Sequence, residues 1–567
     1  MIPLHLSLGP EPVLAVLHPG ARDRTAVLLL PPFGWEEMCS YRPRRDWAEH
    51  LAARGHPVLR LDLPGTADSA GGPRDPDRVD AWVATVTAAA GWLRAETGAG
   101  AVAGIGIGLG GLVAGAALAR GAAIDDLILW GVPARGRTLV RELSAFARLE
   151  ASQFPDAPPA PGGVLAAAGY VLTEETQAAL SDLDLTAAPL PARRALLLER
   201  EGMAVDAKLR DQLAASGAEV EVAPGPGWAA MMAEPQEAAP PREVFARVEA
   251  WLDETSPAER PPGPATAPDP LPALPLPGAR ERPFGPDGLA GILTEPDDPA
   301  RPPLTAVLLN AGAQRRTGPN RIWVEAARRW AALGVTTLRL DLEGLGDAEG
   351  DATRYSDVAG LYVPELVAQV STALDALEAD GRPPAFVVGG LCSGAYWAFH
   401  TALEDPRVTA VLMLNPRVLF WDPGIEEERE AGKAAKALRG EGWRRLARGE
   451  ISPAQIPVTA RALARRARAA PARRRAAHRA PSDPLPGALA TLERRGVQSL
   501  LAFSGAEPLH DELARDGHLA RLGEWPSLRL AELPGAVHTL RPLPAQVAAH
   551  ALLDDALGRR LASPPRR

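Results

Sequence analysis

The sequence predicts an α/β protein in which one doubly wound, mostly parallel sheet is built twice. Three observations indicate this. Short apolar runs alternate with longer helical patterns, four landmarks recur in the same order, and a proline-rich stretch separates the two series. The chain has 567 residues, 46% of them hydrophobic and 23% charged, which is enough for two domains with separate cores.

The recurring landmarks indicate two copies of one fold. The clearest is LRLDLPGTADSAG within residues 51–71, which returns as LRLDLEGLGDAEG within residues 330–350. Three further pairs are TAVLLLPPFG from Thr25 with TAVLLNAGAQ from Thr305, GIGLGG from Gly106 with GLCSGA from Gly390, and PGPGWAAMM from Pro224 with LPGAVHTLR from Leu533. Between the copies, proline recurs so often that helices and central strands are blocked. We therefore expect a first domain at 1–255, a linker at 256–280 and a second domain at 281–567.

The second copy has the clearer pattern of elements. Two helices are expected where apolar residues recur at helical spacing and end at a glycine, at 321–334 and 363–381. Strands are expected at the apolar runs 304–312, 336–342, 385–390, 408–416 and 497–505. Uninterrupted apolar strands between helices are typical of a parallel sheet covered on both faces.

A nucleophile elbow is predicted between the third of these strands and the helix after it. In Gly390-Leu391-Cys392-Ser393-Gly394 the cysteine takes the place of the serine in G-x-S-x-G, and its neighbours are small enough for a tight turn. The helix N-terminus favours a thiolate at Cys392. The Ser393 N–H is the first expected oxyanion donor, and the second comes from the loop after an earlier strand, from Gly312 or Ala313.

A base and an orienting acid follow in the chain order of nucleophile, acid and histidine. His538 follows the strand-like run 527–533 and is the expected base. Glu507, two residues after Gly505, is the first choice for the acid, and Asp511 is the alternative. The triad predicted from the sequence is thus Cys392, His538 and Glu507 or Asp511.

These motifs resemble the α/β-hydrolase superfamily, in particular serine-aminopeptidase-like bacterial hydrolases found beside polysaccharide or polyketide biosynthesis genes. LLNAGAQRRTGPNR, LRLDLEGLGDAEG, GGLCSGAYWA, LNPRVLFW and PGAVHTLRP carry the resemblance, which spans about Thr305 to Arg541. It implies the fold, a nucleophile at Cys392 and a base at His538. The cysteine nucleophile is also similar to that of dienelactone hydrolases. Glu507 is a departure, because members of the family more often have Asp there.

The first copy resembles the same family over about Thr25 to Trp251 but is predicted to be inactive. Its elbow has Gly108 at the nucleophile position, Trp228 at the histidine position and Met203 near the acid position. None of these side chains can attack a carbonyl or accept a proton. Cys39, on the loop expected after the first strand of this copy, is interpreted as structural.

Two further features are interpreted more conservatively. Asp62, Asp68, Asp341 and Asp347 are expected to shape loops near the site and not to act as acids or bases. Residues 461–480 contain eight arginines within an insertion at about 417–490, which in this family forms a cap over the pocket. The arginines suggest an anionic partner, and a solvated surface is the alternative.

Composition excludes several other classes. The net charge of −9 argues against nucleic-acid binding, and two cysteines cannot form a disulfide framework. We find no signal peptide, membrane span, metal motif or dinucleotide fingerprint, so a cytoplasmic protein without a cofactor is expected. The predicted function is hydrolysis of an ester or thioester, on a small molecule or a carrier, through an acyl-cysteine. The alternatives are acyl transfer with the same residues and a non-catalytic scaffold.

Overall fold

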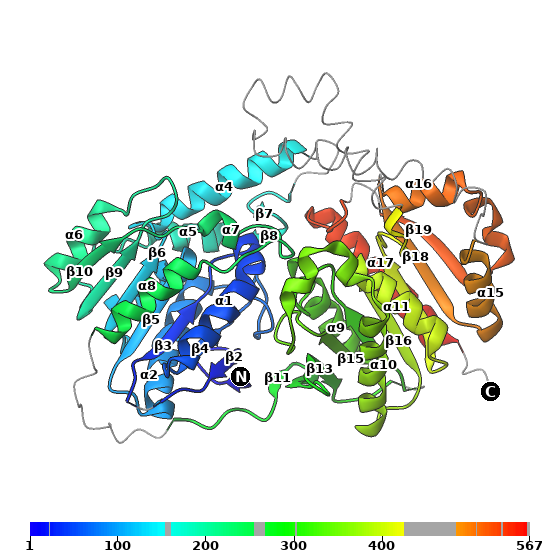
Figure 1. Cartoon of the computed structure of the whole chain (residues 1–567), viewed down its shortest axis with the longest axis horizontal. Coiled ribbons are helices and arrows are strands. Elements are labelled where there is room, and N and C mark those ends of the chain that lie inside the picture. The colour runs from blue at the N-terminus through cyan, green and yellow to red at the C-terminus, as the bar shows by residue number, and fades with distance from the viewer. Residues whose placement is uncertain are drawn as a thin grey trace. The chain divides into compact units, whose positions relative to one another are not determined.

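The computed structural model describes residues 1–21, 23–153, 160–254, 267–300, 303–424, 483–505, 507–533 and 537–563. The predicted fold class is confirmed: two large, mostly parallel sheets are present, one in residues 1–254 and one in residues 267–563, here called the N-terminal and C-terminal halves. Figure 1 shows the strands of the first sheet in blue to green and those of the second in green to orange.

The first sheet has the strand order β1-β2-β4-β3-β5-β6-β9-β10, with β1 and β2 antiparallel and the other strands parallel to one another. Its strands are β1 (Ile2–Leu6), β2 (Val13–His18), β3 (Ala26–Leu30), β4 (Val58–Leu61), β5 (Val102–Ile107), β6 (Asp126–Trp130), β9 (Arg194–Leu198) and β10 (Glu219–Ala223), and a separate hairpin contains β7 (Leu165–Ala167) and β8 (Tyr170–Leu172). The helices of this half are α1 (Trp35–Ala53), α2 (Arg78–Thr97), α3 (Leu109–Ala119), α4 (Gly136–Gln153), α5 (Glu174–Asp182), α6 (Ala207–Ala215), α7 (Trp228–Met231) and α8 (Arg242–Asp253).

The second sheet has the order β11-β12-β13-β15-β14-β16-β17-β18-β19, with parallel pairing from β15 to β19. Its strands are β11 (Leu274–Leu276), β12 (Ala279–Pro283), β13 (Ala290–Pro296), β14 (Thr305–Leu309), β15 (Thr336–Asp341), β16 (Phe386–Leu391), β17 (Val408–Leu414), β18 (Gln498–Ser504) and β19 (Leu528–Leu533). The described helices are α9 (Ile322–Ala332), α10 (Pro364–Ala379), α11 (Ser393–Glu404), α15 (Leu485–Arg495), α16 (Pro508–Arg515) and α17 (Leu543–Ala562). Apart from β11, the two sheets share one strand order.

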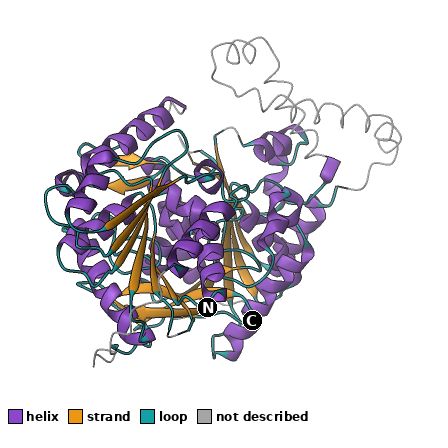
Figure 2. Ribbon diagram, turned by 60° about the vertical axis from the view of Figure 1, so that its left-hand side comes forward, coloured by secondary structure: helices purple, strands orange, loops and turns teal. Residues whose placement is uncertain are grey.

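Helices cover both faces of each sheet, as Figure 2 shows. In β3, Ala26, Leu28 and Leu30 belong to one buried apolar cluster, whereas Val27 and Leu29 belong to another. Because side chains alternate across a strand, the two clusters lie on opposite faces. Every residue of β3 is therefore buried, which explains its uninterrupted apolar sequence.

Some boundaries differ from those expected. Strand β11 and the start of β12 fall within the stretch assigned to the linker, so the second sheet begins before residue 281. They are added at the sheet's antiparallel edge, where proline is tolerated. The sequence alignment of the first landmark is also wrong by one residue, because it matched Thr25 with Thr305. In the sheets, Ala26 pairs with Val102 and Thr305 pairs with the equivalent Phe386, so Ala26 is the true counterpart of Thr305.

The compact units of the structure follow a different division from the predicted domains. Met1–Arg417 and Leu492–Arg567 form one unit that contains both sheets, and Val418–Thr491 form the other. The second unit covers nearly the same residues as the insertion expected at about 417–490. In the part of the chain that the structure describes, no helix is both long and apolar enough to cross a membrane.

A set of buried ion pairs joins the two halves within the first unit. Arg316 contacts Asp68 of the N-terminal half at 3.0 Å and Asp341 of its own half at 2.7 Å. Arg339 pairs with Asp68 as well and lies 2.9 Å from Glu281. Burial alone would raise the pKa of Asp68, but the two guanidinium groups outweigh it and hold the pKa below its usual range.

The same set includes the other carboxylates noted in the sequence. Arg60 lies 2.7 Å from Asp347, which also accepts a hydrogen bond from Tyr41 at 2.6 Å. Arg315 lies 3.1 Å from Asp62. The sequence placed these acids on loops near the site, but it did not indicate that they pair with the other half of the chain.

Candidate active site

The predicted elbow lies between β16 and α11. Cys392 has φ 56° and ψ −114°, a conformation that a residue with a Cβ seldom adopts. Small neighbours make the turn possible: a Cβ added at Gly390 would lie 2.1 Å from the Gly394 backbone, and one at Gly394 would lie 2.5 Å from the Asn310 carbonyl. The turn therefore places a half-buried thiol at the N-terminus of a helix and at the carboxyl end of a central strand.

His538 and Glu507 meet beside this thiol. His538 Nδ1 lies 3.0 Å from both carboxylate oxygens of Glu507, whose side chain is buried. This interaction leaves Nε2 for the hydrogen bond between His538 and the Cys392 thiol. Asp511 is not part of this arrangement, because its side chain is 74% exposed and its carboxylate lies 3.7 Å from His510.

The charges of the pair favour a thiolate and an imidazolium. Burial raises the pKa of the Cys392 thiol, but His538 outweighs burial, with further help from Arg417 and the Ser393 N–H, and the pKa falls below its usual value. Burial lowers the pKa of His538, but Cys392 and Glu507 reverse this and raise the pKa to about 10. A proton on the ring and a negative charge on the sulfur therefore stabilise each other.

The candidate oxyanion donors differ in their present partners. The Ser393 N–H bonds to the thiol of Cys392. The Gly312 N–H donates to the Ser393 hydroxyl oxygen at 2.9 Å, so it is already engaged. In the part of the chain that the structure describes, no hydrogen bond occupies the Ala313 N–H. Of the two residues left open by the sequence, Ala313 is thus the one with a donor to spare.

Other residues that hold the site were not identified from the sequence. Asn415, at the end of β17, donates to the His538 carbonyl at 2.9 Å and to Ser504 Oγ at 2.8 Å. Asn415 and Arg417 lie in the LNPRVLFW motif. Their roles were not visible from it, because their partners lie about 90 residues or more away in the chain or across the elbow.

The N-terminal half also contributes to the loops of this site. Three residues after His538, Arg541 lies 4.0 Å from the ring centre of Trp35 and 3.4 Å from Glu234. A Cβ added at Gly312 would lie 2.5 Å from Gln236 Nε2, so Gln236 fills the space beside the loop that carries Ala313. Sequence patterns could not indicate these contacts, because they depend on how the two halves pack.

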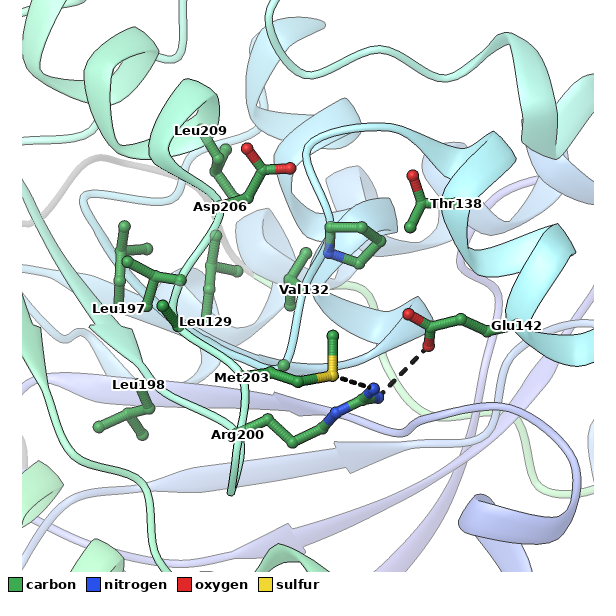
Figure 3. Close-up of a pocket in the computed structure, with 14 residues that line it drawn as sticks. Leu129, Val132, Thr138, Glu142, Leu197, Leu198, Arg200, Met203, Asp206 and Leu209 are labelled. Atoms are coloured by element: carbon green, nitrogen blue, oxygen red, sulfur yellow. Dashed lines mark hydrogen bonds and ion pairs between the residues drawn. The ribbon is translucent and has the colours of Figure 1, made fainter.

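The equivalent place in the N-terminal half has the same backbone but different side chains. Gly108 has φ 50° and ψ −116° and begins α3 as Cys392 begins α11. Met203 is the counterpart of Glu507. Leu198 and Ala502 have equivalent neighbours in their sheets, and Met203 and Glu507 each lie five residues later in the chain. Met203 lines a cavity of about 210 Å³. In this cavity, the guanidinium of Arg200 contacts both the sulfur of Met203 and the carboxylate of Glu142 (Figure 3).

Trp228 and Cys39 are both buried in the N-terminal half. Trp228 packs edge-on against Trp130 at 5.2 Å between ring centres. Cys39 lies on α1 and not on the loop expected from the sequence, and burial raises the pKa of its thiol. A buried, protonated thiol is consistent with the structural interpretation.

The arginine-rich segment 461–480, for which an anionic partner was predicted, lies outside the described residues. Among the described residues, no group of three or more His, Cys, Asp and Glu side chains is arranged to hold a metal ion.

No protein-family model matches the chain, and no curated protein sequence matches it. Among solved structures, it is similar to a dienelactone hydrolase from Anabaena variabilis at 16% identity and a TM-score of 0.32, over 50% of this chain and 98% of that one. It is also similar to Est1E from Butyrivibrio proteoclasticus, solved with ferulic acid, at 14% identity and a TM-score of 0.32, over 44% of this chain and 98% of that one. A proline iminopeptidase from Mycobacterium smegmatis matches at 14% identity and a TM-score of 0.31, over 45% of this chain and 98% of that one.

Proposed function

We propose that the C-terminal half hydrolyses an ester or thioester through an acyl-enzyme on Cys392. The observation that carries this proposal is the hydrogen-bonded series from the Cys392 thiol through the His538 ring to the buried Glu507 carboxylate. A nucleophile, a base and a group that orients the base are the three parts that covalent acyl transfer needs. Their place at the carboxyl end of a parallel sheet is where such sheets bind ligands.

Acylation begins from the thiolate and imidazolium. An electron pair on Cys392 Sγ attacks the acyl carbonyl carbon, and the carbonyl π electrons move onto its oxygen. When the tetrahedral intermediate collapses, the bond to the leaving oxygen or sulfur breaks, and the leaving group takes the proton from His538. An acyl-cysteine and a free alcohol or thiol result.

Deacylation uses the neutral imidazole that acylation leaves. His538 accepts a proton from water while the water oxygen attacks the thioester carbon. The C–S bond then breaks, the carboxylic acid leaves, and Cys392 is again a thiolate beside an imidazolium. Glu507 holds the ring in the orientation and tautomer that both steps require.

We assign the oxyanion hole to the backbone N–H groups of Ser393 and Ala313. Both belong to tight turns at the carboxyl ends of neighbouring strands, β16 and β14. Such a donor is commonly worth about 3 kcal/mol to the transition state. The engaged Gly312 N–H supports Ala313 as the second donor.

The N-terminal half is proposed to have lost catalysis after a duplication and to support the other half. Shared strand order and elbow backbone favour the duplication. Gly108, Met203 and Trp228 cannot replace a nucleophile, an acid and a base. The ion pairs of Asp62 and Asp68 with Arg315 and Arg316 support the second part, because these arginines lie two and three residues after Ala313.

Intact-mass spectrometry after brief exposure to short-chain activated esters and thioesters tests the proposal. The unmodified protein should gain one acyl group that Cys392→Ala lacks and that His538→Ala forms slowly. Decay of the adduct in water supports a hydrolase, and decay only with an added alcohol or amine supports the acyltransferase alternative. If no adduct forms with any donor, the chain is a scaffold and the proposal is wrong.

A further inference from the structure

A second cavity, of about 200 Å³, lies on the N-terminal half where the proposed oxyanion loops have their equivalents. Phe33, Gly34 and Leu109 contribute to its wall, together with Tyr170 and, from the C-terminal half, Asn320 and Arg321. Leu109 follows Gly108 as Ser393 follows Cys392. The cavity is distinct from the candidate active site, because neither Cys392 nor His538 lines it.

Gly34 is the structural counterpart of Ala313. Leu30 of β3 pairs with Gly106, and Leu309 of β14 pairs with Gly390, which holds the same place before the elbow. Leu30 and Leu309 are therefore equivalent, and so are the residues four positions after them, Gly34 and Ala313. The N-terminal half has thus lost its nucleophile but retains a cavity formed by the same loops. A cavity at this edge of a parallel sheet is the usual position for a ligand.

Arg321 is a buried cation on the wall of this cavity that lacks an ion-pair partner among the described residues. Its Nε donates to the Ala67 carbonyl at 2.7 Å, and its Nη2 donates to the carbonyls of Ser69 and Gly71 at 2.8 Å. No carboxylate of the described residues lies within ion-pair distance of it. Burial, aided by Arg328, lowers its pKa to about 9.

Arg74 is a second cation on the wall, exposed and without a hydrogen bond or ion pair to any described residue. The two carboxylates that also line the cavity have partners of their own. Glu37 pairs with Arg44 at 2.7 Å and Arg315 at 2.9 Å, and Glu325 lies 3.3 Å from His550. The unpaired charge of the wall is therefore positive.

We propose that this cavity binds a small organic carboxylate, with its apolar body inside the cavity and its carboxylate against Arg74 and Arg321. A buried guanidinium without a counter-ion is costly, and a carboxylate matches its planar donors. Proline, phenylalanine, leucine and valine side chains form much of the wall and suit an apolar body. A cavity of about 150 Å³ accommodates benzene, so a ligand of roughly that size or slightly larger fits here.

The test is calorimetric titration of the full-length Cys392→Ala variant with benzoate, cyclohexanecarboxylate and hexanoate, each paired with its primary amide. Cys392→Ala removes the proposed nucleophile, so the result does not depend on the proposed enzyme activity. At least one acid should bind with a Kd on the order of 1 mM or tighter. Its amide, which lacks the charge, should bind at least about tenfold more weakly.

Variants locate the binding. Arg74→Gln should weaken the acid about tenfold and leave the amide unchanged, since only the charged contact is lost. Val547→Trp, on the exposed side of the cavity wall, should weaken both ligands by blocking the opening. Arg210→Gln, an exposed arginine paired only with Asp211 in the described residues, is the matched control and should bind both as before.

Three outcomes overturn the proposal. They are no binding by any acid at about 10 mM, equal binding of acid and amide, and undiminished acid binding by both Arg74→Gln and Val547→Trp. Arg321→Gln should also weaken the binding of the acid. Its thermal unfolding is measured in parallel, so that loss of the charged contact is distinguished from loss of the fold. Arg74→Gln keeps the test decisive, because Arg74 is exposed and bonded to no described residue.

Discussion

Gly108 and Cys392 share one backbone conformation, with φ and ψ of 50° and −116° at the glycine and 56° and −114° at the cysteine. The same turn therefore occurs in both halves, although only the C-terminal half has a thiol on it. At Gly108 the conformation is unstrained, whereas at Cys392 the chain bears the cost of a Cβ in the left-handed region. Strain kept at a reactive side chain is typical of a functional site.

Gly108→Cys is predicted not to create a second active site. A Cβ there would meet Pro32 at 3.7 Å and Glu36 Oε2 at 3.8 Å, so there is room for it. The left-handed dihedral at a residue with a Cβ should lower the unfolding free energy, measured by urea denaturation, by about 1 to 2 kcal/mol. In a Cys392→Ala background, acylation at position 108 should be no faster than that of a free thiol. Rapid acylation would show that Trp228 and Met203 do not disable this half.

The lowered pKa of the Cys392 thiol predicts an unusual pH dependence of alkylation. Because its pKa is lowered, the thiolate is present at a lower pH than in a free cysteine, and the rate with iodoacetamide should reach half its plateau below about pH 8.5. In His538→Ala, nothing outweighs the effect of burial on the pKa of Cys392, so the pH at which the rate reaches half its plateau should move above about 8.5. Cys39→Ser is the control and should not change the profile, since Cys39 is buried. Equal midpoints with and without His538 would contradict the ion pair.

Glu507→Gln and Asp511→Asn should separate the two candidate acids. Glu507→Gln keeps the size of the side chain but removes its negative charge and replaces one acceptor oxygen with a donor NH2, which favours the wrong tautomer of the imidazole, so acylation should slow by roughly 10²-fold to 10⁴-fold. The pKa of His538 should also fall from about 10, because Glu507 helps to raise it. The Asp511→Asn variant should be acylated at a rate within about twofold of that of the unmodified protein, as expected for an exposed surface residue. The reverse order of effects would reinstate Asp511.

Asp68→Asn should be strongly destabilising, by about 3 kcal/mol or more, because two buried guanidinium groups lose their shared partner. Asp80→Asn is the control at an exposed pair with Arg120 and should change the unfolding free energy by less than about 0.5 kcal/mol. Urea denaturation measures both variants. Equal stability of the two would mean that the buried pairs contribute nothing net.

The same pairs predict loss of stability in acid. The pKa of Glu281 is lowered to about 2 by Arg328 and Arg339 against the effect of burial, and that of Asp68 is lowered too. A carboxyl group with a lowered folded-state pKa stabilises the fold above its unfolded value near 4 and loses that contribution as the pH falls toward 2. Asp62 and Asp341, whose pKa values burial raises, act in the opposite direction. Unfolding free energy measured from pH 5 to pH 2 should therefore fall less steeply in Asp68→Asn than in the unmodified protein.

The sequence predicted most of the fold because local patterns determine it. The strands β14 to β18 and the helices α9 and α10 lie where apolar runs and helical spacing placed them. The elbow was visible because small residues must surround Cys392. The contacts of Arg315, Arg541 and Gln236 were not, because they depend on packing between residues that are about 75 to 310 positions apart in the chain. The cavity beside Arg321 needs both halves and was invisible for the same reason.

The support that the N-terminal half is proposed to give to the proposed oxyanion loop can be tested with Asp62→Asn. Arg315 lies two residues after Ala313 and contacts Asp62 through both terminal nitrogens. Without that charge the loop should shift, and a displacement of about 1 Å can slow acylation by as much as about 10²-fold. Burial raises the pKa of Asp62, so its neutral replacement should cost less stability than Asp68→Asn.

Alkylation is the readout that distinguishes this role from general damage. Iodoacetamide reacts with the thiolate without forming an oxyanion, so its rate should be unchanged in Asp62→Asn while acylation by an activated ester slows. Asp80→Asn should leave both rates unchanged. Parallel loss of both rates would mean that Asp62 acts on Cys392 or on the fold as a whole. No loss of either would mean that Glu37, the other carboxylate that pairs with Arg315 among the described residues, is sufficient to hold the loop.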